Sequence, residues 1–186
     1  PDGYFLWSTI QKHLDEEFKN LGVENVYFPM LISESNLNKE QSHIDGFAPE
    51  VAWLEHKTDN KTDDETNDVA RRIAIRPTSE CAIYPLLKDN IRSYNDLPLK
   101  YNQFCSVLRW ETKDTVPFIR SREFLWNEGH TCFSNKEDAI SEAHDIIEIY
   151  KNVYEKLLCV PVIKGIKTNY EKFAGAEFTL TCEAFI

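Results

Sequence analysis

The segment from Arg109 to His130 constrains the fold of this 186-residue chain more than any other part. It reads as two β-strands joined by a short, charged turn. Because alternate residues of a strand share a face, one face is made by two series: Cys105, Val107, Arg109 and Glu111 of the first strand, and Phe124, Trp126, Glu128, His130 and Cys132 of the second. A strand that faces a core alternates apolar with solvated polar residues. These series instead mix apolar and ionisable groups, which is typical of a face that binds a polar ligand.

The side chains on this face indicate which kind of ligand it would accept. Arg109 and Arg120 offer planar guanidinium groups that match a phosphate or a carboxylate, and Phe124 offers a surface on which a base can stack. A small cationic or amphipathic group could bind beside the remaining polar and aromatic residues, Trp126, Glu128 and His130. The alternative interpretation is a surface hairpin with cross-strand ion pairs.

Length and composition predict one folded domain without a membrane segment. A chain of 186 residues is long enough for one domain with a real core, and no apolar run approaches the roughly 20 residues that a membrane helix needs. The first residues do not form a basic stretch followed by an apolar one, so we predict no signal peptide. Five cysteines without a C-x-x-C pair suit reduced thiols in the cytoplasm better than disulfides or a zinc site.

The net charge of −10 argues against broad binding of RNA by this chain, because phosphate neutralisation is the main source of such affinity. If the protein does bind RNA, we expect most of the contacts to lie elsewhere. Part of the excess negative charge is local, in a polar stretch at about residues 57–70 that holds five carboxylates: Asp59, Asp63, Asp64, Glu65 and Asp68. We predict a flexible loop between two strands there, and no function for it.

Hydrophobic periodicity predicts an α+β fold in which an antiparallel sheet is flanked by helices. Helices are expected at residues 4–21, 78–90 and 136–158, and strands at residues 24–28, 73–75, 97–100, 103–111, 122–133, 160–164 and 177–185. Gly22 should end the first helix, and Thr78 should be the N-cap of the second. Thr78 and Glu80 would then stand in a first helical turn where a ligand could reach them. The alternative interpretation is an ordinary capped helix that binds no ligand, in which Glu80 only interacts favourably with the helix dipole.

The amino-acid sequences of several segments resemble those of a known family. Arg109-Trp110-Glu111, a variable loop, and a returning strand with Arg120 and Phe124 are similar to motif 2 of the class II aminoacyl-tRNA synthetases. Three further segments resemble the prolyl-tRNA synthetases of the eukaryotic and archaeal type: residues 47–53, residues 76–80 and residues 126–130, which read FAPEVAW, RPTSE and WNEGH. Residues 23–29 resemble motif 1, and residues 172–176 resemble the segment leading towards the last third of the family's sequence.

The resemblance implies a partial class II catalytic domain over residues 1–186, with motif 1 at about 4–33 and motif 2 at about 103–133. Motif 3, which carries an arginine for the γ-phosphate, and the anticodon-binding domain are absent from this sequence, so we expect a fragment that is inactive alone. Motif 1 implies a homodimer. The alternative to a dimer interface is an ordinary helix that packs on the sheet of its own chain, which would give the same sequence pattern over residues 4–33.

The implied reaction activates L-proline with ATP, accompanied by Mg²⁺, and transfers the prolyl group to tRNA(Pro). The resemblance gives the catalytic role to Arg109. It assigns ATP binding to Arg109, Glu111, Arg120, Ser121 and Phe124. It assigns proline binding to Thr78, Glu80, Arg109, Trp126, Glu128, His130 and, as a second wall for the ring, Phe47. For His130 a structural hydrogen-bonding role is equally compatible with the sequence, and we expect no metal ion bound by protein side chains.

Two other functions remain open from the sequence. One is a synthetase-like module that keeps the fold and binds proline without catalysis. Arg109, Glu111 and Phe124 favour the enzyme, because a proline sensor has no use for an adenine platform. The other is a class II enzyme for a different amino acid, which the set of Thr78, Glu80, Trp126 and His130 disfavours.

Overall fold

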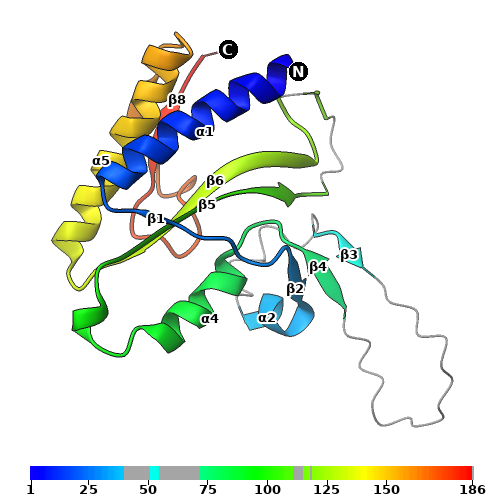
Figure 1. Ribbon diagram of the computed structural model, residues 1–186, viewed down its shortest axis with the longest axis vertical. Coiled ribbons are helices and arrows are strands. Elements are labelled where there is room, and N and C mark those ends of the chain that lie inside the picture. The colour runs from blue at the N-terminus through cyan, green and yellow to red at the C-terminus, as the bar shows by residue number, and fades with distance from the viewer. Residues whose placement is uncertain (40–50, 55–71, 111–114, 118, 186) are drawn as a thin grey trace, which may run out of the picture. The chain divides into compact units, whose positions relative to one another are not determined.

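The computed structural model describes residues 1–39, 51–54, 72–110, 115–117 and 119–185 (Figure 1). Two of the predicted site residues, Phe47 and Glu111, lie outside the described residues, as does the acidic stretch 57–70. By its internal contacts the chain forms two compact units. Unit 1 comprises Pro1–Val26, Ile91–Phe104 and Asn127–Ile186, and unit 2 comprises Tyr27–Asn90 and Cys105–Trp126. The chain therefore passes repeatedly from one unit to the other.

Most elements belong to one unit. Unit 1 holds α1 (Asp2–Asn20), β1 (Glu24–Asn25), a 3₁₀ turn (Tyr94–Asp96), α5 (Lys136–Asn152), which continues as a π-helical turn (Val153–Leu157), β7 (Ile163–Ile166) and β8 (Leu180–Glu183). Unit 2 holds β2 (Leu31–Ser33), α2 (Glu34–Lys39), β3 (Trp53–Leu54), β4 (Ile73–Ile75) and α4 (Glu80–Asn90). The two long strands, β5 (Leu99–Leu108) and β6 (Glu123–Cys132), contribute residues to both units.

The described strands form three sheets, in the orders β1-β5-β6, β2-β4-β3 and β7-β8. Pairing is antiparallel between β2 and β4, between β3 and β4, and between β7 and β8. The predicted α+β class with antiparallel sheets and flanking helices is confirmed. One pair differs, because β1 runs parallel to β5, with Glu24 opposite Tyr101. A long connection separates these two strands, and only a short hairpin forces antiparallel pairing.

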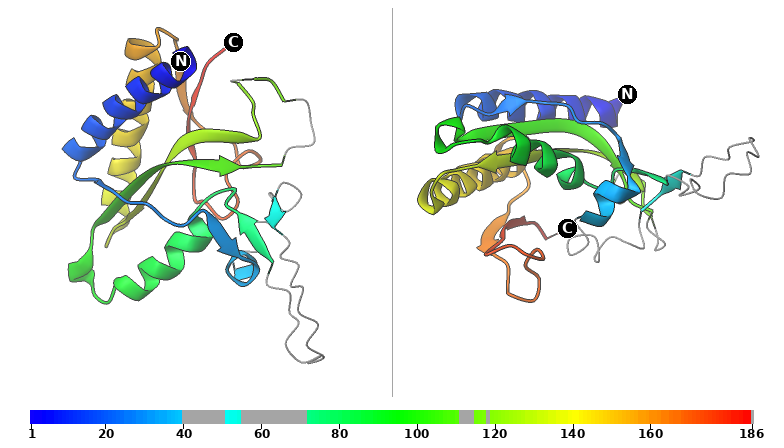
Figure 2. Two further views of the ribbon diagram at one scale, coloured as in Figure 1. Left: turned by 45° about the vertical axis from the view of Figure 1, so that its right-hand side comes forward. Right: turned by 90° about the horizontal axis from the view of Figure 1, so that it is seen from below.

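The core of unit 1 lies where α1 packs against α5, and Figures 1 and 2 show the two helices side by side. Leu14 and Phe18 of α1 are one helical turn apart and share a face. They are buried with Ile149 of α5 and Val153 of the π-helical turn. The helix ends at Asn20, and Gly22 follows with a φ of 75°. A positive φ favours glycine, so the stop that the sequence predicted at this glycine is confirmed.

Tyr150 of α5 joins this core to strand β6 of the β1-β5-β6 sheet. Its hydroxyl accepts a hydrogen bond from Asn127 Nδ2 at 2.9 Å, and its ring meets Phe18 edge-on at 6.2 Å. Burial raises the pKa of Tyr150 above its ordinary value of 10.0, because the phenolate would lose its hydration. The hydrogen bond from Asn127 acts in the opposite direction, and the nearby Tyr154 adds to the rise.

This raised pKa predicts a loss of stability at alkaline pH. Above pH 10 the unfolded chain ionises at Tyr150 while the folded protein keeps the proton, so the free energy of unfolding falls as pH rises. We expect Tyr150→Phe to make this fall shallower between pH 9 and 11, measured by urea unfolding. Tyr94→Phe, at an exposed tyrosine, is the control and should leave the slope unchanged. Identical slopes for all three proteins would show the prediction to be wrong.

The core of unit 2 combines apolar side chains with a buried arginine. Its apolar members are Ile32, Leu37, Val51, Ala74 and Cys81, with Trp53 packed against them. Arg76, directly after β4, is 0% exposed. Its Nε donates to the carbonyl of Ser106 at 2.9 Å, its Nη1 donates to the carbonyl of Phe28 at 2.7 Å, and its guanidinium lies 5.3 Å from the ring centroid of Tyr27. Arg76 thus ties together three separate stretches of backbone.

Several element boundaries differ from the prediction. Helix α4 begins at Glu80, so Ser79 and not Thr78 precedes it, and the predicted N-cap is wrong. The strands expected at 97–100 and 103–111 are one strand, β5, which ends at Leu108. The last helix becomes π-helical after Asn152. None of the helices in the described part of the chain is both long and apolar enough to cross a membrane.

Candidate functional site

Arg109, the residue directly after β5, is the centre of an aromatic cluster in unit 2. Its backbone N–H donates to the carbonyl of Arg122 at 2.8 Å, which closes the base of the loop between β5 and β6. Its Nε donates to the carbonyl of Pro77 at 3.2 Å. The guanidinium carbon lies 5.6 Å from the ring centroid of Phe124 and 5.3 Å from that of Trp126. Cation–π contact and a carbonyl thus hold the guanidinium in one orientation.

Phe124 and Trp126 occupy alternate positions of β6, as the sequence predicted, and their rings are perpendicular at 5.8 Å. The indole Nε1 of Trp126 is buried and has no hydrogen-bond partner among the described residues. A buried donor without a partner is uncommon in a folded protein. Together with the guanidinium of Arg109, this donor makes the cluster suited to an anionic or carbonyl oxygen of a ligand.

Thr78 and Glu80 lie at the start of α4 in the same unit. The hydroxyl of Thr78 donates to the carboxylate oxygen Oε2 of Glu80, so the two predicted proline-binding residues contact each other. Both are half-buried, between the buried Pro77 and Ser79 and the rest of the helix. The backbone N–H groups of Ala82 and Ile83 bond to the carbonyl of Ser79. The structure therefore places Glu80 in the first turn of a helix, as predicted, although Thr78 does not cap it.

Arg120 and Ser121 lie in the turn before β6. Arg120 is exposed, and its backbone forms a two-way antiparallel bridge with Val116, with N–O distances of 2.9 and 2.8 Å. The hydroxyl of Ser121 donates to the carbonyl of Glu123 at 2.6 Å. The guanidinium of Arg122 lies 4.5 Å from the ring centroid of Trp110. The turn therefore presents the cationic side chain of Arg120 to solvent.

Glu128 and His130 form a buried polar network in unit 1. Each is 7% exposed, and His130 Nε2 lies 3.2 Å from Glu128 Oε2. The other carboxylate oxygen, Oε1, accepts a hydrogen bond from Gln103 Nε2 at 2.6 Å. Cys132 follows on the same face, and burial raises the pKa of its thiol, which disfavours the nucleophilic thiolate. The sequence placed Glu128 and His130 on one face but did not identify Gln103.

Several buried polar residues were not identified from the sequence, among them Gln103 and Arg76. Gln103 and Arg76 are both 0% exposed, and polar residues of these types are most often exposed. For Gln103 a signal was present, because Asn102 and Gln103 form an amide pair within a stretch otherwise typical of a strand. For Arg76 no signal was present, because its partners are backbone carbonyls far away in the sequence.

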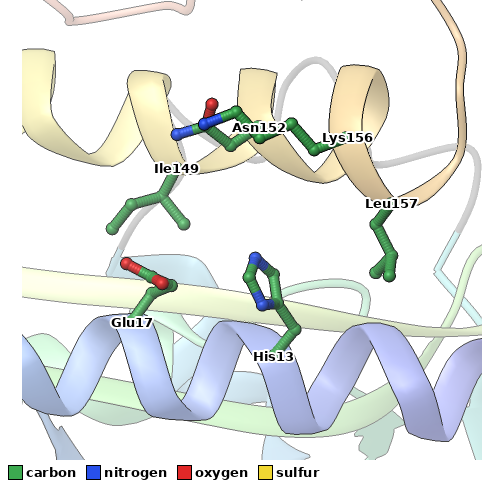
Figure 3. Close-up of a pocket in the computed structure, with 6 residues that line it drawn as sticks. All are labelled: His13, Glu17, Ile149, Asn152, Lys156 and Leu157. Carbon is green, nitrogen blue, oxygen red and sulfur yellow. The ribbon is translucent and has the colours of Figure 1, made fainter.

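Two surface pockets lie in unit 1, and none of the predicted site residues lines either of them. One, of about 170 Å³, lies between α1 and the C-terminal end of α5, and Figure 3 shows its lining: His13, Glu17, Ile149, Asn152, Lys156 and Leu157. The other, of about 370 Å³, is mostly apolar and is lined by Ala143, Ile146, Ile147, Tyr150, Phe178, Thr179 and Leu180. In the described part of the chain, no group of three His, Cys, Asp or Glu side chains could hold a metal ion.

Comparison with known proteins gives relatives whose names all include proline–tRNA ligase. The chain is 50% identical over its whole length to a proline–tRNA ligase of Lachnospira eligens, of which it covers 37%. It is 48% identical to a proline–tRNA ligase of Encephalitozoon cuniculi, of which it covers 36%. It is also 50% identical to a bifunctional glutamate/proline–tRNA ligase of Cricetulus griseus, of which it covers 12%.

A solved structure resembles the whole chain. It is the crystal structure of prolyl-tRNA synthetase from Cryptosporidium parvum complexed with halofuginone and AMPPNP, with a TM-score of 0.89 and 45% sequence identity over 100% of this chain and 35% of that one. The chain thus spans well under half the length of each of these relatives. Residues 59–184 match the family model described as tRNA synthetase class II core domain (G, H, P, S and T). The chain belongs to this class II synthetase family.

Proposed function

We propose that the full-length protein is a proline–tRNA ligase. It would activate L-proline with ATP to form prolyl-adenylate and pyrophosphate, and then transfer the prolyl group to a hydroxyl of tRNA(Pro). The observation that carries this proposal is about 50% identity, over the whole of this chain, to proteins named as proline–tRNA ligases. The cluster around Arg109 supports it, because it combines a fixed guanidinium with an indole N–H that has no hydrogen-bond partner among the described residues.

In the proposed reaction the carboxylate of proline attacks the α-phosphorus of ATP, and no protein nucleophile is needed. Two unit charges about 4 Å apart interact by about 4 kcal/mol at an effective dielectric near 20, so a cation between the two anions is the first requirement. Arg109 would supply it. Its planar guanidinium would bridge the carboxylate and the α-phosphate and stabilise the charge that spreads over phosphorus in the transition state.

ATP would be held by the loop between β5 and β6 and by the strands beside it. Phe124 would stack on adenine, and Glu111 would accept a hydrogen bond from its amino group. Arg120 and Ser121 would contact the outer phosphates or the base; the exposure of Arg120 supports this role. Mg²⁺ would accompany ATP and be held largely by the phosphates, as is usual for this ion.

Selective binding of proline needs acceptors for its secondary ammonium group and a fitted aromatic wall for its rigid ring. Thr78 and Glu80 would accept from the nitrogen, and Trp126 with Phe47 would contact the ring. Glu128 and His130 would complete the site. The hydrogen bond from the hydroxyl of Thr78 to the carboxylate of Glu80 supports their acting as a pair.

We further propose a cytoplasmic homodimer that contacts tRNA(Pro) mainly through regions outside this sequence. The net charge of −10 supports RNA contacts outside this chain, because affinity for RNA comes mainly from cations that neutralise phosphates. Exposed apolar side chains at the start of α1 support the dimer, since Tyr4 and Phe5 are each 68% exposed.

The test of this proposal is amino-acid-dependent ATP–pyrophosphate exchange by the full-length protein. We expect exchange with proline and none with alanine, cysteine or glycine. Saturable proline binding without exchange would instead support the non-catalytic module, and exchange with another amino acid would assign a different substrate.

The ATP-binding roles predict separable effects of two substitutions. Arg120→Ala should raise the KM for ATP several-fold, because it removes a cation for the phosphates. Phe124→Ala should raise the KM for ATP roughly tenfold, since stacking contributes about 1–3 kcal/mol per base, and it should lower the preference for ATP over GTP, because adenine is then no longer held in place beside Glu111. ATP–pyrophosphate exchange kinetics at varied nucleotide concentration would measure the effects of both substitutions.

Leu125→Ala is the matched control for Phe124→Ala. Leu125 is the next residue of β6, points to the opposite face and is 45% exposed. It should leave nucleotide preference unchanged. Unchanged ATP kinetics in both Arg120→Ala and Phe124→Ala would remove these residues from the ATP site.

A further inference from the structure

Strand β5 carries two fully buried amides at successive positions. Asn102 is 1% exposed and Gln103 is 0% exposed, and successive residues of a strand point to opposite faces of its sheet. The two side chains are thus similar in chemistry and burial and differ in what they contact.

The amide of Asn102 joins structural elements to one another. Its Nδ2 donates to Asn25 Oδ1 of β1 at 3.2 Å, and its Oδ1 accepts from Asn127 Nδ2 of β6 at 3.1 Å. Asn127 in turn donates to the hydroxyl of Tyr150. Both direct partners of the Asn102 amide are neutral amides, and neither is a predicted ligand-binding residue.

The amide of Gln103 has a charged partner. Its Nε2 donates to Oε1 of Glu128 at 2.6 Å, and Oε2 of the same carboxylate lies 3.2 Å from Nε2 of His130. A buried carboxylate needs hydrogen-bond donors to remain ionised at low cost. With a different donor on each oxygen, the carboxylate plane cannot rotate without breaking one of the two contacts.

This arrangement also determines which ring nitrogen of His130 carries hydrogen. An ionised carboxylate only accepts hydrogen bonds, so the Nε2 that faces Glu128 is the protonated nitrogen. In the neutral ring, Nδ1 then has the lone pair. The orientation of the imidazole, and the chemical character of its other nitrogen, therefore follow from where the carboxylate of Glu128 is held.

We propose that Gln103 is a positioning residue for the binding of proline: it orients the carboxylate of Glu128 and, through it, the imidazole of His130. This inference rests on the proposed function. Proline has a rigid and nearly featureless ring, so selectivity depends on placing the few polar groups accurately, and displacements of about 1 Å are large on this scale. A neutral donor suits the task, because a cation at position 103 would neutralise Glu128 and a carboxylate would repel it.

The experiment measures ATP–pyrophosphate exchange by the full-length protein with Gln103→Met, which retains the length of the side chain and removes the donor. We expect the KM for proline to rise roughly 10- to 100-fold, the range for loss of a hydrogen bond to a buried charged group. The KM for ATP should change little, whereas the melting temperature should fall, because the buried carboxylate of Glu128 loses a hydrogen-bond donor. Gln103→Asn, a shorter amide that cannot reach Glu128 and disturbs polarity less, should raise the KM for proline in the same direction.

Asn102→Ala is the matched control. It removes an equally buried amide from the neighbouring position of the same strand, so it should lower the melting temperature and leave the KM for proline unchanged. The inference is overturned if the Gln103 variants leave the KM for proline unchanged, if they alter the kinetics for ATP equally, or if Asn102→Ala raises the KM for proline as much. It is also overturned if neither Gln103 variant folds while Asn102→Ala does, because the amide would then be purely structural.

The proposed function and this inference fail in different ways. If the unmodified protein shows no proline-dependent exchange, the proposed function fails, and the inference fails with it. If the unmodified protein exchanges normally with proline and the Gln103 variants match it, only the inference fails.

Discussion

Arg109→Ala is expected to lower proline-dependent ATP–pyrophosphate exchange about 10²- to 10³-fold, the loss typical of removing one group that stabilises transition-state charge. The physical reason is that the proposed reaction joins two anions, and Arg109 is the cation proposed to lie between them. The guanidinium is already oriented in the structure by the carbonyl of Pro77 and the rings of Phe124 and Trp126. A preoriented group loses little freedom in the transition state, so its removal should lower kcat as well as raise KM.

Two further variants separate charge from geometry at this position. Arg109→Lys keeps a positive charge but loses the planar, bidentate guanidinium, so its activity should lie between those of the unmodified protein and Arg109→Ala. Arg122→Ala is the matched control, because Arg122 flanks the same loop and its guanidinium lies over Trp110. If Arg109→Ala and Arg122→Ala reduce exchange by the same small factor, Arg109 does not have the proposed role.

Arg76→Leu is expected to destabilise the protein by about 3 kcal/mol, because an unsatisfied buried acceptor costs about 1–3 kcal/mol. The substitution removes the donors that reach the carbonyls of Phe28 and Ser106. It also leaves a space in a region where Arg76 is 0% exposed. Removing the charge recovers part of its desolvation cost, which keeps the expected effect near 3 kcal/mol. Urea unfolding of the full-length protein would measure it.

Arg72 provides the control for this second substitution. Its guanidinium lies 4.5 Å from the ring centroid of Trp53, and it pairs with Glu34 at 3.7 Å, but its side chain is 46% exposed. Exposed ion pairs contribute about 0–1 kcal/mol, so Arg72→Ala should have a small effect. Equal destabilisation by Arg76→Leu and Arg72→Ala would mean that the contacts of Arg76 do not support the core of unit 2.

The sequence predicted those elements whose hydrophobic periodicity is long enough to be distinctive. Helix α1, helix α5 and strand β6 were predicted nearly at their observed positions, whereas β5 was predicted as two separate strands. The elements β2, α2 and β3 were not predicted, because elements of two to six residues show too few periods to be recognised. The distribution of the strands over three sheets was not predicted either, since it depends on pairing between distant segments.

In the candidate site, too, the features set by local sequence pattern were predicted, and those that depend on distant segments were not. A strand has a fixed period of two residues, so alternation along β6 correctly predicted which side chains share one face. These are Phe124, Trp126, Glu128 and His130. The N-cap at Thr78 was wrong, since its hydroxyl contacts the side chain of Glu80 and not the backbone. The part played by Gln103 depends on register between two strands, which a single sequence does not contain. The ligand-binding roles of all these residues stay predictions.

The discontinuity of the two units has a consequence for the order of folding during synthesis. All residues of unit 2 have been made once Trp126 has been added, whereas unit 1 requires segments up to its last stretch, Asn127–Ile186. Leu14 and Phe18 of α1 bury their side chains against Ile149 and Val153, more than 120 residues later. Because chains emerge from the ribosome at about 5–20 residues per second, the apolar face of α1 stays uncovered for roughly 6 to 30 seconds. During that interval Leu14 and Phe18 lack the side chains of Ile149 and Val153 that cover them in the folded protein.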